Sequence, residues 1–169
     1  MAYKYSILFV DDEVNILSSL KRGLMDEDYT CFFASSGKKA LEIMANEKIS
    51  VIVSDMRMPE MYGLTLLKEV QKKYPHTVRI VLSGYTQLQQ VLTTINQVDV
   101  FKFITKPWKL EEEFKGIINK ALEYYKLREE NEEFKHALEA KNRAYQNILR
   151  HIEDTISSAR KSGEAVGTL

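Results

Sequence analysis

The fold of this chain follows from one stretch of its sequence, Val51-Ile52-Val53-Ser54-Asp55-Met56-Arg57-Met58-Pro59. Its first three residues are apolar and β-branched, which predicts a short strand buried on both faces of a sheet. The strand leads directly into the carboxylate of Asp55, and Pro59 prevents its continuation and favours a turn. An acidic residue in this place has a structural role, as an ordinary turn or helix-capping residue, or a functional one. The residues at the other strand ends distinguish these two interpretations.

Length and charge limit the classes of protein to consider. A chain of 169 residues has room for one ordinary domain and an appendage. Its 24 basic and 24 acidic residues balance to a net charge of zero, so electrostatics predict neither direct nucleic-acid binding nor membrane association. The single cysteine, Cys31, cannot form an internal disulfide or a cysteine zinc site. No apolar run approaches a membrane span and residues 1–5 lack a signal peptide's apolar core, so we expect a cytoplasmic protein.

Short apolar runs alternate with segments of helical periodicity over the first 122 residues. The runs predict strands at Ile7–Val10, Thr30–Ala34, Val51–Ser54, Val78–Leu82 and Val100–Ile104. This alternation predicts an α/β fold in which helices cover both faces of a parallel sheet. Because crossovers are right-handed, we expect a doubly wound five-stranded parallel sheet of order 2-1-3-4-5. Lys102 in the last run fits a strand at the sheet edge.

Reactive side chains stand at the carboxyl ends of four of these strands. They are Asp11 and Asp12 after the first strand, Asp55 after the third, Ser83 after the fourth and Lys106 after the fifth. In doubly wound sheets, ligands bind beyond the carboxyl ends of the strands, at the point where the winding direction switches. That point lies between the first and third strands here, so we expect the five side chains to converge on one site.

The chemistry of these five side chains points to phosphoryl transfer. Three neighbouring carboxylates repel one another unless a cation holds them, and oxygen ligands suit Mg²⁺. No histidine or cysteine stands near the strand ends to favour a transition metal. Lys106 supplies a positive charge for a phosphoryl oxygen, and the Ser83 hydroxyl can donate a hydrogen bond to another. The set therefore predicts a site that forms and holds a phosphoryl group on Asp55.

Each of these residues also has a purely structural explanation. Asp11 and Asp12 could cap the following helix, and Ser83 could belong to a plain turn. Lys106 could be a solvated lysine before a helix-starting Pro107. We favour the functional interpretation because four strand ends carry the required groups in the right order.

Taken together, the motifs resemble the receiver domain of two-component response regulators, the CheY-like superfamily, over about residues 4–122. The resemblance rests on Phe9-Val10-Asp11-Asp12-Glu13, on Asp55-Met56-Arg57-Met58-Pro59 with Gly63, on Ser83-Gly84 and on Lys106-Pro107. As a set these motifs are highly specific. The resemblance implies the flavodoxin-like strand order already expected, and phosphorylation of Asp55 by a sensor histidine kinase in the presence of Mg²⁺.

The resemblance also implies a role for each site residue. Asp12, Asp55 and the main-chain carbonyl of Arg57 would bind Mg²⁺ directly, and Asp11 would act largely through water. Lys106 would bind the phosphoryl group, and its bond to the following proline would be cis. The last two implied roles belong to a conformational switch that responds to phosphorylation. Ser83 would be the switch hydroxyl, and Phe103 would be the switch aromatic residue.

Two positions near the acceptor are bulky enough to shield a phosphoryl group from water, Arg57 and Tyr85. No enzyme activity is expected beyond Mg²⁺-dependent self-phosphorylation and dephosphorylation of the aspartate. A phosphotransferring hydrolase is disfavoured because no second acid stands two residues after Asp55. The main alternative is a receiver-like scaffold that dimerises without being phosphorylated.

The remainder of the chain predicts one long helix, with a break near Arg128 to Glu133, where acidic residues cluster, as the alternative. Glu, Lys, Ala, Leu and Arg dominate it, and no proline follows Glu111. A helix of about 50 residues would be roughly 75 Å long, too long to be buried on so small a domain. We expect a receiver domain at 1–122, a coiled-coil extension of the fifth helix at 123–161, and a flexible tail at 162–169 that marks the cut edge of a longer protein.

A seven-residue repeat in the extension predicts a parallel dimer. The a series is Ile117, Tyr124, Asn131, Leu138, Tyr145, Ile152 and Ala159, and the d series is Lys120, Leu127, Phe134, Lys141, Ile148 and Thr155. Most of these positions are apolar, and a polar Asn at an a position favours two strands in fixed register. The expected partners are a second copy of the chain and an output domain outside this sequence. A helix that folds back on the receiver, or docks on such an output domain, is the alternative.

Overall fold

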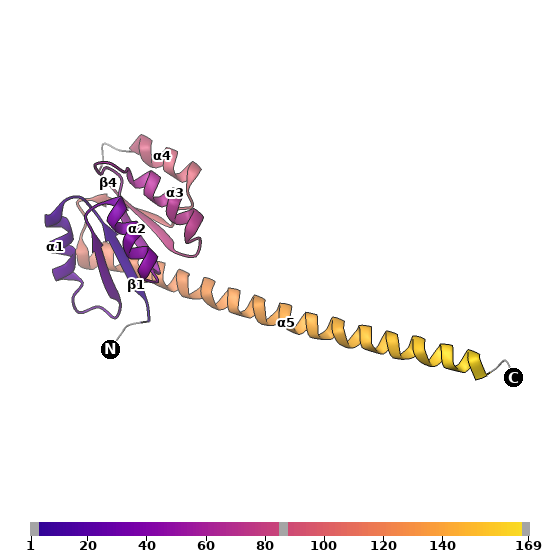
Figure 1. The fold of residues 1–169 in the computed structure, drawn as a ribbon. Helices are drawn as coiled ribbons and strands as arrows, with labels where there is room; N and C mark the ends of the chain where they lie inside the picture. Colours follow the sequence, from indigo (N-terminus) through magenta and orange to yellow (C-terminus); the bar gives the residue numbers. More distant parts are fainter. Residues whose placement is uncertain (1–3, 85–87, 167–169) are drawn as a thin grey trace. The chain divides into compact units, whose positions relative to one another are not determined.

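The computed structural model describes the backbone of residues 4–84 and 88–166, and the chain divides into two compact units, 1–128 and 129–169. The elements in chain order are β1 (Ser6–Val10), α1 (Val14–Gly23), β2 (Thr30–Ala34), α2 (Gly37–Asn46), β3 (Val51–Asp55), α3 (Gly63–Lys73), β4 (Val78–Gly84), α4 (Leu88–Gln97), β5 (Lys102–Lys106), the short π-helix η2 (Leu110–Phe114) and α5 (Lys115–Val166) (Figure 1). Strands and helices thus alternate through the first unit, as predicted.

The five strands form one parallel sheet of order β2-β1-β3-β4-β5, which confirms the predicted architecture. The central strands β1 and β3 are buried along their whole length, as the apolar runs Ile7–Val10 and Val51–Val53 predict. β5 is an edge strand, and its Lys102 is exposed, as expected. β5 begins and ends two residues later than predicted, because its pairing with β4 starts at Lys102, opposite Ile80, and runs to Lys106, opposite Gly84.

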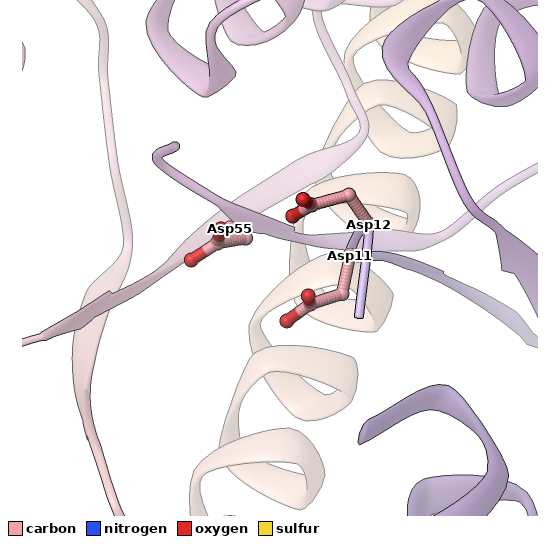
Figure 2. A group of neighbouring side chains, drawn as sticks. All are labelled: Asp11, Asp12 and Asp55. Atoms are coloured by element: carbon pink, nitrogen blue, oxygen red, sulfur yellow. The ribbon is translucent and has the colours of Figure 1, made fainter. Parts of the chain in front are cut away.

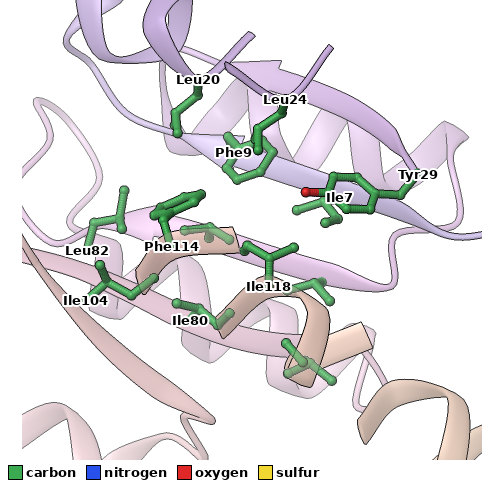
Figure 3. Packing of buried hydrophobic residues seen from close by; sticks show 14 of the residues in the cluster. Ile7, Phe9, Leu20, Leu24, Tyr29, Ile80, Leu82, Ile104, Phe114 and Ile118 are labelled. Carbon is green, nitrogen blue, oxygen red and sulfur yellow. The ribbon is translucent and has the colours of Figure 1, made fainter. Parts of the chain in front are cut away.

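Two hydrophobic cores lie on opposite faces of the sheet, because successive side chains of a strand point to opposite sides. Ile7 and Phe9 of β1 join the core formed with α1, η2 and the first turns of α5, where Phe114 and Ile118 are fully buried (Figure 3). The alternate residues of β1 join the other core, which α2 and α3 cover. A sheet packed on both faces holds its strand ends in fixed relative positions.

The strand register aligns the carboxyl ends of the strands at one edge of the sheet. Val10 pairs with Ser54, so Asp11 and Asp55 follow at the same level. Asp55 pairs in turn with Leu82, next to Ser83. The register between β4 and β5 places Gly84 opposite Lys106. The peptide bond between Lys106 and Pro107 is cis, as the family resemblance implied.

The helix α5 extends from Lys115 to Val166 without a break. The second unit begins at residue 129, six residues after the predicted start of the extension, and the helix ends five residues beyond the predicted end at 161. Residues 167–169 lie outside the described part of the chain. Among the residues that are described, no helix combines the length and apolar character needed to cross a membrane.

Candidate functional site

Three carboxylates meet at the edge where β1 and β3 end. Asp11 and Asp12 follow β1, Asp55 is the last residue of β3, and one oxygen atom of each lies within 4.8 Å of the others (Figure 2). Asp11 and Asp55 are buried, whereas Asp12 is more exposed. The predicted convergence of these three side chains is therefore found, and it places concentrated negative charge in a largely enclosed position.

Lys106 connects two of the carboxylates. Its Nζ lies 2.8 Å from Oδ2 of Asp11 and donates a hydrogen bond to it, and it lies 3.2 Å from Oδ1 of Asp55. Glu13 also approaches, with its Oε1 3.5 Å from the same Nζ, although this carboxylate is well exposed. This contact of Glu13 was not predicted, and the place of Glu13 in the acidic run Asp11-Asp12-Glu13 is the one signal in the sequence that indicates it.

Burial and charge together set the pKa values of the two ionised groups. Burial raises the pKa of Asp55 above its usual range, and the nearby charge of Asp11 adds to the rise, while Lys106 acts against it. Burial alone would lower the pKa of Lys106, but the hydrogen bond to Asp11 and the charges of Asp55 and Asp11 outweigh it and raise that pKa. Lys106 is therefore a permanent cation in a site that carries excess negative charge.

The backbone around the acids is held by specific contacts. The carboxylate of Asp11 accepts a hydrogen bond from the Glu13 N–H at 2.9 Å, which fixes the turn after β1. After β3, the Gly63 N–H donates to the Met56 carbonyl at 3.0 Å and draws the start of α3 against the site. A Cβ atom at position 63 would stand 2.1 Å from the Asp55 carbonyl oxygen, so this close approach requires glycine.

The remaining predicted site residues lie on β4, on β5 and in the loop after β3. Ser83 is buried at the end of β4, where its hydroxyl donates to the Gly84 carbonyl at 3.2 Å. Phe103 is partly buried on β5 against the core covered by α2 and α3. Arg57 is exposed in the loop that follows Asp55. Tyr85, the second expected shielding residue, lies outside the described residues.

Comparison with known proteins gives a consistent result. The model of the response regulator receiver domain matches residues 7–118. The chain is 38% identical over 103 residues to the hydrogenase transcriptional regulatory protein HoxA of Cupriavidus necator, an alignment that covers 61% of this chain and 21% of HoxA. It is 29% identical over 156 residues to the DNA-binding transcriptional regulator NtrC of Proteus hauseri, covering 92% of this chain and 30% of NtrC.

Solved structures show the same relationship. The signal receiver domain of an HD domain-containing protein from Pseudomonas fluorescens superposes with a TM-score of 0.68 at 32% identity, covering 72% of this chain and 96% of that one. The chain spans less than a third of the length of the curated relatives named above. On the strength of the matched residues, the shared fold and the acidic site, this chain belongs to the family of response regulator receiver domains.

Proposed function

We propose that Asp55 accepts a phosphoryl group from a sensor histidine kinase and that the chain relays this event as a signal. The observation that carries the proposal is the position of Lys106, whose Nζ lies between the buried carboxylates of Asp11 and Asp55. A buried carboxylate beside a fixed cation is poised to become a phosphorylated group whose added charge has a ready partner. No other catalytic activity is part of the proposal.

The transfer itself needs one bond to form and one to break. An oxygen of the Asp55 carboxylate attacks the phosphorus atom, and the bond between phosphorus and the donor's imidazole nitrogen breaks. The electron pair of that bond stays with the imidazole. Lys106 is already within 3.2 Å of Asp55 and can neutralise part of the charge that gathers on the phosphoryl oxygens.

The acidic site has the ligand chemistry that Mg²⁺ prefers. Its donors are three carboxylate oxygens within 4.8 Å of one another, and among the described residues no histidine or cysteine belongs to the cluster. Asp12, Asp55 and the Arg57 main-chain carbonyl would hold the ion, with Asp11 acting through water. When bound, Mg²⁺ supplies positive charge to the phosphoryl oxygens during transfer.

Ser83 and Phe103 would transmit the phosphorylation of Asp55 to the surface of the domain. The Ser83 hydroxyl now donates to its neighbour's carbonyl, and it would instead donate to a phosphoryl oxygen on Asp55. Phe103 on β5 would turn inward into the space that Ser83 leaves, and so alter the face made by α4, β5 and α5. Such a two-state change needs a bias of only a few kcal/mol between its states.

The second part of the proposal is that the signal leaves through α5. Its exposed apolar side chains, which include Leu138, Tyr145 and Ile152, would pair with a second copy of the chain in the cytoplasm and guide an output domain or partner. These exposed side chains also favour the alternative, a receiver-like scaffold that dimerises without phosphorylation. The two functions differ in whether Asp55 is modified.

Intact-mass measurement after incubation with acetyl phosphate and Mg²⁺ tests the proposal. We expect one labile phosphoryl adduct, absent from Asp55→Asn and abolished by EDTA. Asp99→Asn is the matched control, because this exposed carboxylate stands outside the acidic site. Equal labelling of Asp55→Asn would exclude Asp55 as the acceptor. A dimer that acquires no phosphoryl group under any of these conditions would favour the scaffold.

A further inference from the structure

An 11-residue repeat runs through the part of α5 that carries the exposed apolar side chains. Three consecutive segments begin at Leu127, Leu138 and Leu149 and read LREENEEFKHA, LEAKNRAYQNI and LRHIEDTISSA. The first position is Leu in all three segments. The eighth is Phe, Tyr and Ile, the eleventh is Ala, Ile and Ala, and the fifth is Asn in the first two and Glu in the third. Recurrence at four positions indicates a common structural unit.

This spacing keeps one face of the helix in line. Eleven residues make three turns at about 3.67 residues per turn, close to the 3.6 of a straight helix, whereas a seven-residue repeat drifts about 20° per repeat. In the second unit, positions one, five and eight form what we call the tail face: Asn131, Phe134, Leu138, Asn142, Tyr145, Leu149, Glu153 and Ile156. Its five apolar members are all about half exposed or more, with Phe134 at 74%.

We propose that the tail face pairs with the tail face of a second copy, parallel and in register, without the left-handed supercoil of a seven-residue repeat. The inference refines the dimer proposed above and rests on it. An 11-residue spacing takes Lys141, Ile148, Ile152 and Thr155 out of the seam and brings in Asn142, Leu149, Glu153 and Ile156. It favours a right-handed or nearly straight pair.

The two asparagines of the tail face indicate that the partner is this chain itself. An Asn side chain both donates and accepts hydrogen bonds, so Asn131 and Asn142 can each pair with their own counterpart in a parallel dimer. Glu130 and Lys135 flank the face on opposite sides, five residues apart, the spacing that brings opposite charges together across a parallel pair. An antiparallel pair would satisfy these two amides only in the single register that sets Asn131 against Asn142, whereas the parallel pair in register satisfies each with its own counterpart.

Ile148 and Leu149 distinguish the two spacings. Both are apolar and equally exposed, at 55% and 53%. The seven-residue repeat places Ile148 in the seam and Leu149 beside it, and the 11-residue repeat reverses these places. Ile148 and Ile152 then lie at the border of the tail face and widen it toward its C-terminal end.

Disulfide cross-linking of the whole chain tests the proposal, with Cys31→Ala removing the native thiol. Single-cysteine variants Asn131→Cys, Ile148→Cys, Leu149→Cys and, as a control on the opposite face, Asn147→Cys would be oxidised under identical conditions. We expect Leu149→Cys to cross-link at least threefold faster than Ile148→Cys, Asn131→Cys to cross-link well, and Asn147→Cys to do so poorly.

Other outcomes overturn the inference and identify the reason. Faster cross-linking of Ile148→Cys would establish the seven-residue seam, and a dimer in which Asn131→Cys fails to cross-link would not be parallel and in register. A monomer in sedimentation at high micromolar concentration would mean that the face is covered by something other than a second copy. Acetyl phosphate labelling of the same variants keeps these results separate from the role of Asp55, since labelling does not require pairing.

Discussion

The carbonyl oxygen of Asp55 lies 2.1 Å from the point at which a Cβ atom on Gly63 would stand. The first residue of α3 therefore packs directly on the backbone that carries the Asp55 carboxylate. Any side chain at position 63 must push α3 away from the residues after β3. This contact thus couples the position of α3 to the backbone of the acidic site.

Gly63→Ala should both destabilise the domain and slow labelling of Asp55. We expect a loss of about 1–3 kcal/mol in the free energy of unfolding, the usual cost of forcing an extra carbon into a packed region. Gly116→Ala is the matched control, because no described atom lies within 4 Å of a Cβ at that position in α5. There alanine should stabilise the helix by about 0.5–1 kcal/mol. Urea titrations measure both effects, and equal values for the two variants would contradict the steric argument.

Mg²⁺ should stabilise the folded chain through the acidic site. At ten times the dissociation constant the gain is about 1.4 kcal/mol, which thermal unfolding detects as a rise in Tm. Asp12→Asn should lose most of this gain and, in EDTA, be at least as stable as the original chain, since one repelling charge is gone. Asp26→Asn, an exposed acid outside the cluster, should keep the full response. An unchanged response in Asp12→Asn would exclude Asp12 as a ligand.

Ser83→Ala should prevent a phosphoryl group at Asp55 from altering the surface made by β5 and α5. Beryllofluoride, a stable mimic of the phosphoryl group, should shift the amide resonances of β5 and of the receiver part of α5 in the original chain. In Ser83→Ala those distant shifts should shrink severalfold while those next to Asp55 persist, because the group at Asp55 has lost its hydrogen-bond donor. NMR spectra with and without beryllofluoride give the comparison. Undiminished shifts at Phe103 would show that the signal does not pass through Ser83.

Arg79 should stabilise the fold through main-chain contacts more than through its ion pair. Its side chain is 3% exposed and donates to the carbonyls of Thr77 and Asp99 at 2.8 and 2.7 Å. Arg79→Met should cost about 2–4 kcal/mol, since two carbonyls lose a charged donor. Asp99→Asn should cost about 0.5 kcal/mol or less, because that carboxylate is 74% exposed. Chemical denaturation measures the free energy of unfolding of both variants. Similar losses for Arg79→Met and Asp99→Asn would show that the ion pair provides the stability.

Cys31 should be unreactive in the native chain. Burial raises the pKa of its thiol from 9.0 to about 11, so about one molecule in a thousand carries the thiolate at pH 8. Modification by a thiol-specific reagent should be slow at pH 8, accelerate toward pH 11, and be immediate in guanidinium chloride. Rapid native modification at pH 8 would be incompatible with the raised pKa.

The same shift has a consequence for stability. The pKa of the Cys31 thiol is higher in the folded chain than in the unfolded chain. The contribution of this thiol to the free energy of unfolding is therefore fully present below pH 9 and declines as the pH rises toward 11. Burial also raises the pKa of Tyr29, which acts in the same direction. The free energy of unfolding of Cys31→Ala should therefore fall less steeply with pH than that of the original chain.

The amino-acid sequence alone determined the architecture of the first unit. Uninterrupted apolar runs such as Ile7–Val10 indicate strands buried on both faces, and their alternation with helices favours a covered parallel sheet. Right-handed crossovers then leave one natural strand order. The site residues followed from the same logic, because parallel strands bring their carboxyl ends to one edge. Asp11, Asp12 and Asp55 could thus be placed together before any distance was known.

Only the tertiary structure decided which groups touch. A strand-end position limits Lys106 to the neighbourhood of the acids, but its long side chain can reach several of them. Packing selects Asp11 at 2.8 Å and Asp55 at 3.2 Å and adds Glu13 at 3.5 Å. The need for glycine at position 63 likewise depends on the distance between α3 and β3. Periodicity and strand order are local or topological and can be read from sequence, whereas contact distances depend on how the whole core packs.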